Sequence, residues 1–155
     1  MTANFEFELA LLFPLGSRVV IEELHRQLAA RGYDDVRPAH GFAFQRIARG
    51  GATGNELAAF LDITKQAASQ MIDELEAKGY VTRQPNPDDR RGKHLALTAR
   101  GYGCLHESAT ILGAIEAEWV AILGAERLVA LRADLRRLIT ATAGGTMPTQ
   151  FRPAW

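Results

Sequence analysis

The stretch ELAAFLDITKQAASQMIDELEAKGYVTRQPNPDDRRGKHLALTARG, residues 56–101, decides the fold of this chain. Thr53 lies three residues before Glu56, and this Thr-x-x-Glu spacing is the capping box that begins many α-helices. We therefore predict a short helix from Glu56 to Leu61, followed directly by a turn.

A second helix is predicted over residues 65–78, because Thr64 can cap its start and Gly79 is the residue type that often ends a helix. Its inward apolar stripe consists of Ala68, Met71, Ile72 and Leu75. Two helices joined by so short a turn predict a helix-turn-helix.

Residues 80–84 and 93–98 favour two strands of a hairpin, since both segments alternate and are rich in β-prone side chains. The long tip between them contains Gly92, which tolerates a positive φ. The predicted fold class is thus mainly α with a small β-hairpin wing, a winged helix-turn-helix.

The wing tip carries dense charge of both signs. We predict that Asp89 pairs with Arg91 and holds the shape of the tip, so that the remaining positive charge points outward. Arginine is suited to the strong negative potential of a narrow minor groove. The basic residues of the wing are Arg83, Arg90, Arg91 and Lys93. The alternative is a solvated charged turn, whose ion pairs contribute about 0–1 kcal/mol each.

The helix over 65–78 also presents side chains that can hydrogen-bond base edges in a major groove. With Thr64 at its N-terminus, the candidate readers are Lys65, Gln66, Ser69 and Gln70. The alternative is an ordinary solvated face, since polar surface residues are common. Between residues 53 and 98 the chain has six basic and seven acidic residues, so we expect modest, salt-sensitive non-specific affinity.

Apolar residues at helical spacing predict further helices on both sides of this lobe, over residues 9–31, 38–48, 99–123 and 125–142. Pro14 marks either the true start of the first of these helices or a kink in it. The outer helices are more apolar than the lobe needs for its own core, which favours a two-fold dimer. We divide the chain into N-terminal dimerisation helices (1–49), the DNA-binding lobe (50–98), C-terminal dimerisation helices (99–143) and a flexible tail (144–155).

Composition bounds the class of protein. The formal net charge of the 155 residues is zero, so any contact with DNA must come from local patches. The single cysteine excludes an internal disulfide framework. The N-terminal segment lacks a basic leader, and its apolar run is broken by Pro14, Gly16 and Arg18. We expect a cytoplasmic protein with no membrane partner.

The stretch quoted above resembles the winged-helix core of the MarR (multiple antibiotic resistance regulator) family over about 45 residues. The pieces that carry the resemblance are ELA, TKQAAS, the L-E-x-K-G-Y-V junction, and D-x-R followed by L-x-LT-x-x-G. The resemblance implies a homodimeric transcription factor, usually a repressor, whose first, fifth and sixth helices form the dimer. It also implies that the fourth helix enters the major groove of a pseudo-palindromic operator and that the wing enters the minor groove.

Many members of that family release DNA when a small aromatic or phenolic ligand enters a crevice between the dimer helices and the DNA-binding lobe. The residues expected to line such a crevice are His40, Phe42, Phe44 and Trp119. The alternative is plain core packing, the usual fate of aromatic residues at helical spacing.

Two other signals remain open. Cys104 could sense oxidants, although hydroperoxide-sensing members carry their cysteine in the first helix, and a lone buried thiol is commonly inert. His40 and His106 could approach each other near Glu22 or Glu23, but without a fixed third ligand we predict no metal site.

Other classes of function have less support. The sequence has no Gly-rich phosphate loop, nucleophile elbow or framed carboxylate pair, so we predict no enzyme activity and no cofactor. A winged helix used only for protein contacts is the other alternative, and the polar face of residues 65–78 argues against it.

Overall fold

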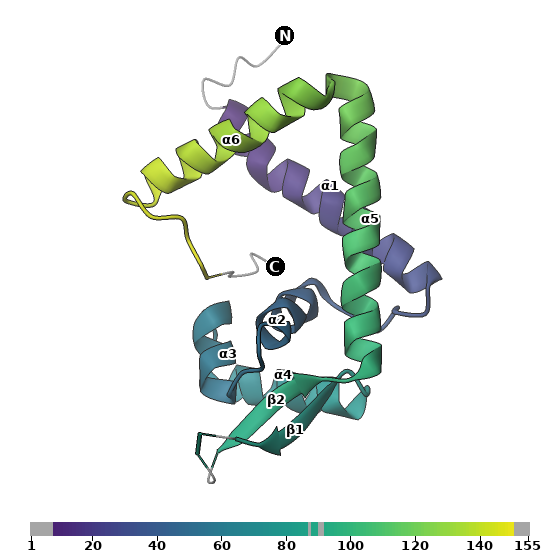
Figure 1. Cartoon of the computed structure of the whole chain (residues 1–155), viewed down its shortest axis with the longest axis vertical. Helices are drawn as coiled ribbons and strands as arrows, with labels where there is room; N and C mark the ends of the chain where they lie inside the picture. The colour runs from purple at the N-terminus through teal and green to yellow at the C-terminus, as the bar shows by residue number, and fades with distance from the viewer. Residues whose placement is uncertain (1–7, 87, 90–91, 151–155) are drawn as a thin grey trace.

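The computed structural model describes residues 8–86, 88–89 and 92–150. A lobe made of three helices and a hairpin lies at one end, and α5 extends from it as a long rod that α1 crosses (Figure 1). The elements are α1 (Glu8–Ala30), α2 (Pro38–Ala48), α3 (Gly54–Leu61), α4 (Lys65–Ala77), β1 (Val81–Pro85), β2 (Lys93–Leu97), α5 (Ala99–Leu123) and α6 (Ala125–Thr142).

The predicted capping box forms and sets the start of α3. Thr53 Oγ1 accepts a hydrogen bond from the Glu56 N–H at 3.2 Å, and Glu56 Oε2 accepts one from the Thr53 N–H at 2.7 Å. The helix begins at Gly54, two residues before the predicted start, because Thr53 is the N-cap and Glu56 is therefore the third helical residue.

The end of α4 explains why β1 begins at Val81 and not at residue 80. Gly79, at φ +77°, donates to the Glu76 carbonyl, and the N–H of Tyr80 donates to the Leu75 carbonyl at 2.9 Å. This is a Schellman motif, which satisfies the last carbonyls of the helix. The backbone N–H of Tyr80 thus belongs to the helix end and not to the hairpin, and the Tyr80 side chain is fully buried.

One hydrophobic core runs from the lobe into the outer helices. In the lobe, Leu57, Leu61 and Leu75 are fully buried. The same cluster continues through residues of α1, α2 and α5, namely Leu24, Leu28, Phe44, Ile47, Cys104, Ile111 and Ile115. The lobe and the middle of the long helices therefore fold as one packed unit.

The start of α5 is pressed against the base of the wing. The Thr98 N–H donates to the Tyr80 carbonyl at 3.0 Å, and Thr98 Oγ1 donates to the Gly79 carbonyl at 2.6 Å. A Cβ at Gly101 would come within 2.4 Å of the Tyr80 carbonyl oxygen, so only glycine permits this approach. The wing leads into α5 without a flexible linker.

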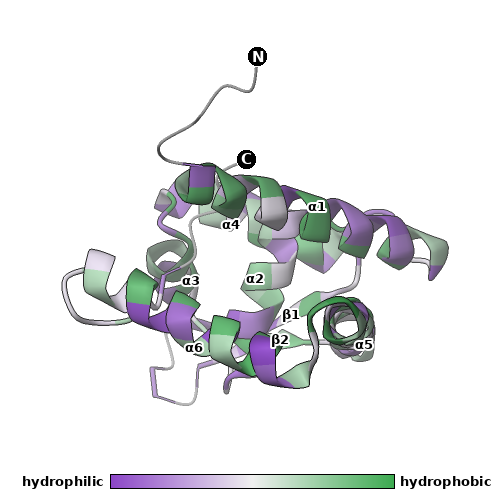
Figure 2. Ribbon diagram, turned by 90° about the horizontal axis from the view of Figure 1, so that it is seen from above, coloured by the Kyte–Doolittle hydropathy of each residue, from purple (hydrophilic) through white to green (hydrophobic). Residues whose placement is uncertain are grey.

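The outer ends of the long helices carry exposed apolar side chains, visible as green bands along α1 and α6 in Figure 2. They include Leu9, Leu12, Phe13, Leu15, Val19, Ile122, Val129, Leu131 and Leu138. Pro14 lies inside α1 and does not mark its start. Among the described residues no single helix meets the length and hydropathy needed to cross a membrane; α5 and α6 meet it only as a pair bent by 114°.

His40 of α2 is the one charged or polar residue among the described residues whose side chain is buried with the core. Burial, reinforced by the neighbouring Arg37 guanidinium, lowers its pKa from 6.5 to about 4. His40 is therefore neutral in the folded protein at pH 7.

This pKa predicts a loss of stability in mild acid. Between pH 6.5 and 4 the unfolded chain binds a proton at His40 that the folded chain does not, so the free energy of unfolding falls as the pH drops. We expect this histidine to contribute a loss of roughly 2 kcal/mol between pH 7.5 and 5, measured by urea unfolding. His40→Gln, which can still accept the capping hydrogen bond, should have a shallower pH dependence. The matched control His106→Gln, at an exposed position, should keep the dependence of the parent chain; equal slopes in all three proteins would contradict the prediction.

Candidate nucleic-acid interface

Helix α4 is oriented by its apolar face. Ala68, Ile72 and Leu75 are buried and Met71 packs half-buried beside them, which confirms the predicted inward stripe. The start of the helix is fixed by Thr64, whose Oγ1 accepts a hydrogen bond from the Ala67 N–H at 3.1 Å. The opposite face places four polar side chains in solvent, those of Lys65, Gln66, Ser69 and Gln70.

The wing is a two-stranded antiparallel sheet whose register pairs Val81 with Leu97 and Pro85 with Lys93. A single bridge between Ala52 and Leu95 attaches it to the segment before α3. His94 Nε2 lies 3.0 Å from the Gly50 carbonyl oxygen and strengthens the same attachment. The wing thus has a fixed position beside the helix-turn-helix.

The described part of the wing tip is held by local hydrogen bonds. The Gly92 N–H donates to the Asp89 carbonyl at 3.0 Å, and the Asn86 N–H donates to the Gly92 carbonyl at 3.2 Å. Asn86 Oδ1 also accepts from the Asp88 N–H at 3.0 Å. Arg90 and Arg91 lie outside the described residues, so the predicted pairing of Asp89 with Arg91 stays a prediction.

Arg83 forms contacts that the sequence does not indicate. Its guanidinium forms ion pairs with Asp73 and Glu76 of α4, and its side chain is only 28% exposed. The hydrogen bond that it donates to Asp73 is the main reason that the pKa of Arg83 is raised above its usual value. Arg83 therefore ties β1 to α4, and any contact with DNA would have to share it with these two carboxylates.

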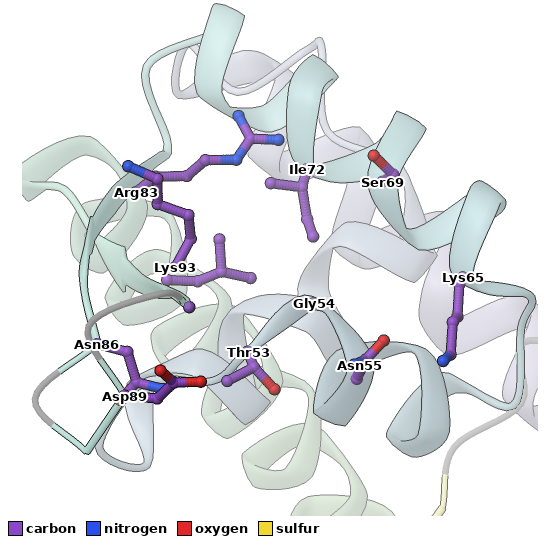
Figure 3. A pocket seen from close by; sticks show the side chains of 12 residues that line it. Thr53, Gly54, Asn55, Lys65, Ser69, Ile72, Arg83, Asn86, Asp89 and Lys93 are labelled. Atoms are coloured by element: carbon purple, nitrogen blue, oxygen red, sulfur yellow. The ribbon is translucent and has the colours of Figure 1, made fainter.

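An open cleft of about 410 Å³ lies between the helix-turn-helix and the wing (Figure 3). Lys65 and Ser69 of α4 and Asn55 of α3 line one side, while Asn86 and Lys93 of the wing line the other. Asp89 of the tip lies beside Asn86 at the cleft. The cleft therefore brings together some of the predicted residues of the helix and the wing, namely Lys65, Ser69, Arg83, Asp89 and Lys93. Thr64, Gln66 and Gln70 are not part of its lining, and Arg90 and Arg91 lie outside the described residues.

The predicted effector residues are only partly brought together. Phe42 and Phe44 line an apolar cavity of about 90 Å³ between α1, α2 and α5, together with Leu24, Leu28, Val36, Leu105 and Leu112. His40 and Trp119 are not part of this lining. His40 faces Arg37 and Glu74, and Trp119, 38% exposed, lies two helical turns beyond Leu112 on α5. The cavity is smaller than the roughly 300–1,000 Å³ of typical ligand pockets.

Cys104 is buried, and burial raises the pKa of its thiol to about 11. The nearby Ser108 hydroxyl donates to the Cys104 carbonyl at 2.8 Å. Because the thiolate is the reactive form, these surroundings favour the inert alternative over a redox sensor. Within the described ranges, no group of three or more His, Cys, Asp or Glu residues is placed to hold a metal ion.

The chain is similar in sequence to known transcriptional regulators. Residues 35–92 match the model of the MarR family. The transcriptional repressor MprA of Escherichia coli K12 is 27% identical over 88 residues, which are 57% of this chain and 50% of MprA. The multiple antibiotic resistance protein MarR of the same organism is 36% identical over 58 residues, which are 37% of this chain and 40% of that protein. The chain thus spans about half the length, or less, of the curated relatives it matches.

Solved structures extend the similarity to the outer helices. The reduced form of MarR from E. coli superposes with a TM-score of 0.73 at 26% identity, covering 88% of this chain and 99% of that one. A mutant of Staphylococcus aureus MepR, bound to an oligodeoxyribonucleotide, has the same fold, with a TM-score of 0.61 at 23% identity over 88% of this chain and 99% of that one.

The surroundings of Cys104 predict a slow reaction with thiol reagents. In the native chain at pH 8, we expect modification at least about a hundredfold slower than for an exposed cysteine, because a pKa near 11 leaves about one thiol in a thousand ionised. The rate is measured with a chromogenic disulfide and compared with the urea-unfolded chain and with Ser69→Cys, an exposed position. Native Cys104 reacting as fast as Ser69→Cys would restore the redox alternative.

Proposed function

We propose that this chain, which belongs to the MarR family of transcriptional regulators, binds a pseudo-palindromic DNA operator as a homodimer and represses transcription until a small aromatic ligand releases it. The observation that carries the proposal is the shared cleft between α4 and the wing. The cleft presents a polar face of α4 and a basic hairpin side by side. It lies at the end of the molecule opposite the helix ends that carry the exposed apolar side chains (Figure 1).

The major-groove part of the proposal rests on the first two turns of α4. Thr64 caps the helix, so its free N–H groups and Lys65 can meet a phosphate. Gln66, Ser69 and Gln70 are exposed and can hydrogen-bond base edges. Buried Ile72 and Leu75 hold the opposite face in place, so these readers are presented on a rigid surface.

In the minor-groove part, Arg90 and Arg91 are the inserting side chains and Lys93 is a phosphate contact. Asp89 pairs with Arg91 to shape the tip. In this proposal Arg83 supports the wing and does not insert into the groove, because its ion pairs with Asp73 and Glu76 hold the wing at a fixed angle to α4. Arginine reads groove width and potential and does not read base identity directly.

The dimer is proposed from the apolar ends of α1 and α6. Leu9, Leu12, Phe13 and Leu135 line one hollow between these helices. Val19 and Ile122, 58% and 77% exposed, extend the apolar surface. Large exposed apolar surfaces mark interaction sites, and a second copy of the chain would cover them in a two-fold arrangement.

The effector is proposed to enter between α1, α2 and α5, where Phe42 and Phe44 line the existing cavity. His25, Gln45 and Ser108 supply polar groups in the same lining. A ligand larger than the cavity has to push these helices apart, and that movement would reach the lobe through the continuous core. His40 and Trp119 would join the site only after such a rearrangement.

Fluorescence anisotropy with mixed genomic DNA at two salt concentrations tests the proposal, and sequencing the retained fragments identifies the operator. Binding that weakens with salt and enriches a pseudo-palindrome supports a DNA-binding regulator. Absent or salt-independent binding would favour a protein-interaction adaptor with the same fold.

Substitutions in α4 and in the wing should have different effects on DNA binding. Gln66→Ala or Gln70→Ala should change which operators are preferred, by about 1–3 kcal/mol for each lost base contact. Arg90→Ala or Arg91→Ala should instead weaken binding across many sequences and reduce its salt dependence. Arg26→Ala and Gln27→Ala on α1 serve as matched controls that leave binding unchanged. If all four interface variants bind like the parent chain, the assignment of the groove contacts is wrong.

Asp89→Ala should lower operator affinity, up to about fivefold, although it removes a negative charge from a surface that faces DNA. The reason is that the tip loses the partner that orders Arg91. Asp88→Ala is the neighbouring control for the loss of charge alone. A gain of affinity in Asp89→Ala would show that this carboxylate repels DNA and does not shape the wing.

A further inference from the structure

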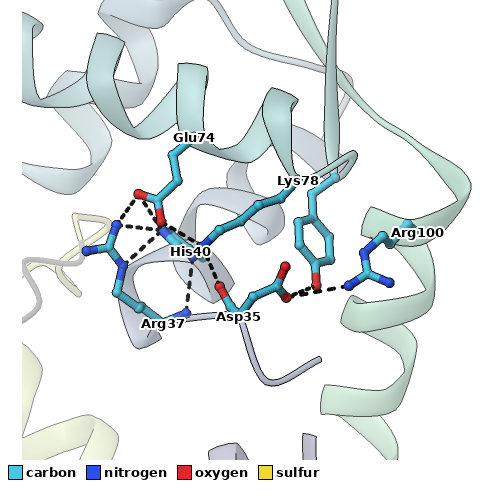
Figure 4. A network of polar contacts seen from close by, with 7 residues as sticks. Asp35, Arg37, His40, Glu74, Lys78 and Arg100 are labelled. Carbon is cyan, nitrogen blue, oxygen red and sulfur yellow. Dashed lines mark hydrogen bonds and ion pairs between the residues drawn. The ribbon is translucent and has the colours of Figure 1, made fainter. Parts of the chain in front are cut away.

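A chain of polar side chains connects the recognition helix to the segment between α1 and α2 (Figure 4). We call this group the polar joint, and it consists of Asp35, Arg37, His40, Glu74, Lys78, Tyr80 and Arg100. None of these residues belongs to the groove-facing set of α4 or to the wing tip.

Glu74 and Lys78 hold the α4 side of the polar joint. They are one helical turn apart, and Lys78 Nζ donates to Glu74 Oε1 at 2.7 Å. Glu74 forms an ion pair with Arg37, and Lys78 Nζ donates to the Asp35 carbonyl at 2.7 Å. Two positions at the C-terminal end of α4 are therefore tied to one short loop.

His40 holds Arg37 where it meets Glu74. The Arg37 N–H donates to His40 Nδ1 at 3.1 Å, and a backbone N–H can only donate, so Nδ1 carries no proton. The proton of the neutral ring is then on Nε2, which lies 3.8 Å from Glu74 Oε2. Arg37 Nε and Nη2 lie 3.4 and 3.2 Å from Nε2, but a protonated Nε2 cannot accept a hydrogen bond from them. The acceptor of the Arg37 guanidinium is therefore the Glu74 carboxylate.

Asp35 extends the polar joint to the wing and to α5. Its carboxylate accepts a hydrogen bond from the Tyr80 hydroxyl, and it lies 3.5 Å from Arg100 Nη2. The Arg100 guanidinium lies over the Tyr80 ring, 4.6 Å from its centre. Arg100 is the second residue of α5, so one cluster joins the recognition helix, the base of the wing and a long outer helix.

We propose that the polar joint sets the angle of α4 relative to α1 and α5, and that Arg37, His40 and Glu74 are positioning residues for the spacing of operator half-sites. The inference rests on the proposed function, since spacing matters only for a dimer on DNA. The joint suits this role because Arg37 is 63% exposed and Glu74 31% exposed. Partly exposed ion pairs are individually weak, so they can set an angle without dominating stability.

The angle can be measured without DNA and without a dimer. Spin labels on Gln66→Cys of α4 and Glu118→Cys of α5, in a Cys104→Ala background, report the distance between the two helices. The labelled chain is mixed with an excess of unlabelled chain, so that an oligomer contains no more than one labelled copy and only distances within one chain are measured. We expect a narrow distance distribution in this background, and a broader or displaced one when Glu74→Gln or Arg37→Gln is added.

Glu107→Gln is the matched control. Glu107 lies 3.5 Å from Arg31, so this variant removes an ion pair between α5 and the end of α1 and leaves the polar joint intact. It should keep the narrow distribution. Arg37→Gln keeps the test open if Glu74→Gln fails to fold, because Arg37 is a largely exposed loop residue.

On DNA, operators with one base pair added or removed between the half-sites provide the second measurement. The parent chain should prefer one spacing, whereas Glu74→Gln should bind that spacing roughly tenfold more weakly and discriminate less between spacings. Adding Arg37→Gln to Glu74→Gln should cost little more, because both remove the same contact.

The outcomes distinguish a failure of the proposed role of the polar joint from a failure of the proposed DNA-binding function. Unchanged distances and unchanged spacing preference in both folded variants, in a parent chain that binds DNA, overturn the polar joint alone. A parent chain that binds no DNA overturns the proposed function, and with it the role of the joint in operator spacing.

Discussion

The burial of one face of α4 is the constraint on which the rest of the structure depends. Ile72 and Leu75 pack into the same core as Leu57 and Leu61 of α3, and this packing leaves the helix no freedom to turn about its axis. The polar side chains at 65, 66, 69 and 70 are exposed as a consequence of that packing. The exposed polar surface of α4 is thus a product of apolar burial on the opposite side of the same helix, and polar contacts only adjust its direction.

A second constraint is the continuity between the lobe and α5. Gly101 allows the helix to start against the Tyr80 carbonyl, and the core continues upward through Cys104 and Ile111. With no flexible linker at this point, a displacement of the long helices has to move the lobe or break these contacts. Two sets of polar contacts hold the other parts in place. The Arg83 ion pairs hold the wing against α4, and the polar joint holds α4 against the segment between α1 and α2.

What the sequence predicts well is local chemistry. The bounds of α2, α5 and α6 agree with the predicted 38–48, 99–123 and 125–142, because Pro38, Thr98 and Gly124 mark ends that depend on neighbouring residues alone. Contacts between distant segments are not predictable in the same way. Arg37 and Glu74 are 37 positions apart, and no periodicity indicates that a loop before α2 meets the far side of α4. For want of the same information, the sequence does not indicate that Phe42 and Phe44 line one cavity while Trp119 lies outside its lining.

The charge of the lobe shows how such contacts alter a functional argument. By count, residues 53–98 are slightly acidic, which weakens a DNA-binding hypothesis. In the fold, however, Asp73 and Glu76 are engaged by Arg83, and Glu74 is engaged by Arg37, a cation from outside the counted segment. Glu56 is likewise held by its capping box and lies 3.4 Å from Arg46. Four of the seven acidic residues are thereby paired with cations, and two of these cations, Arg37 and Arg46, lie outside the counted segment. Lys65 and Lys93 meanwhile line the open cleft. The potential that a phosphate backbone meets depends on this distribution, so a zero net charge is compatible with a surface that attracts DNA.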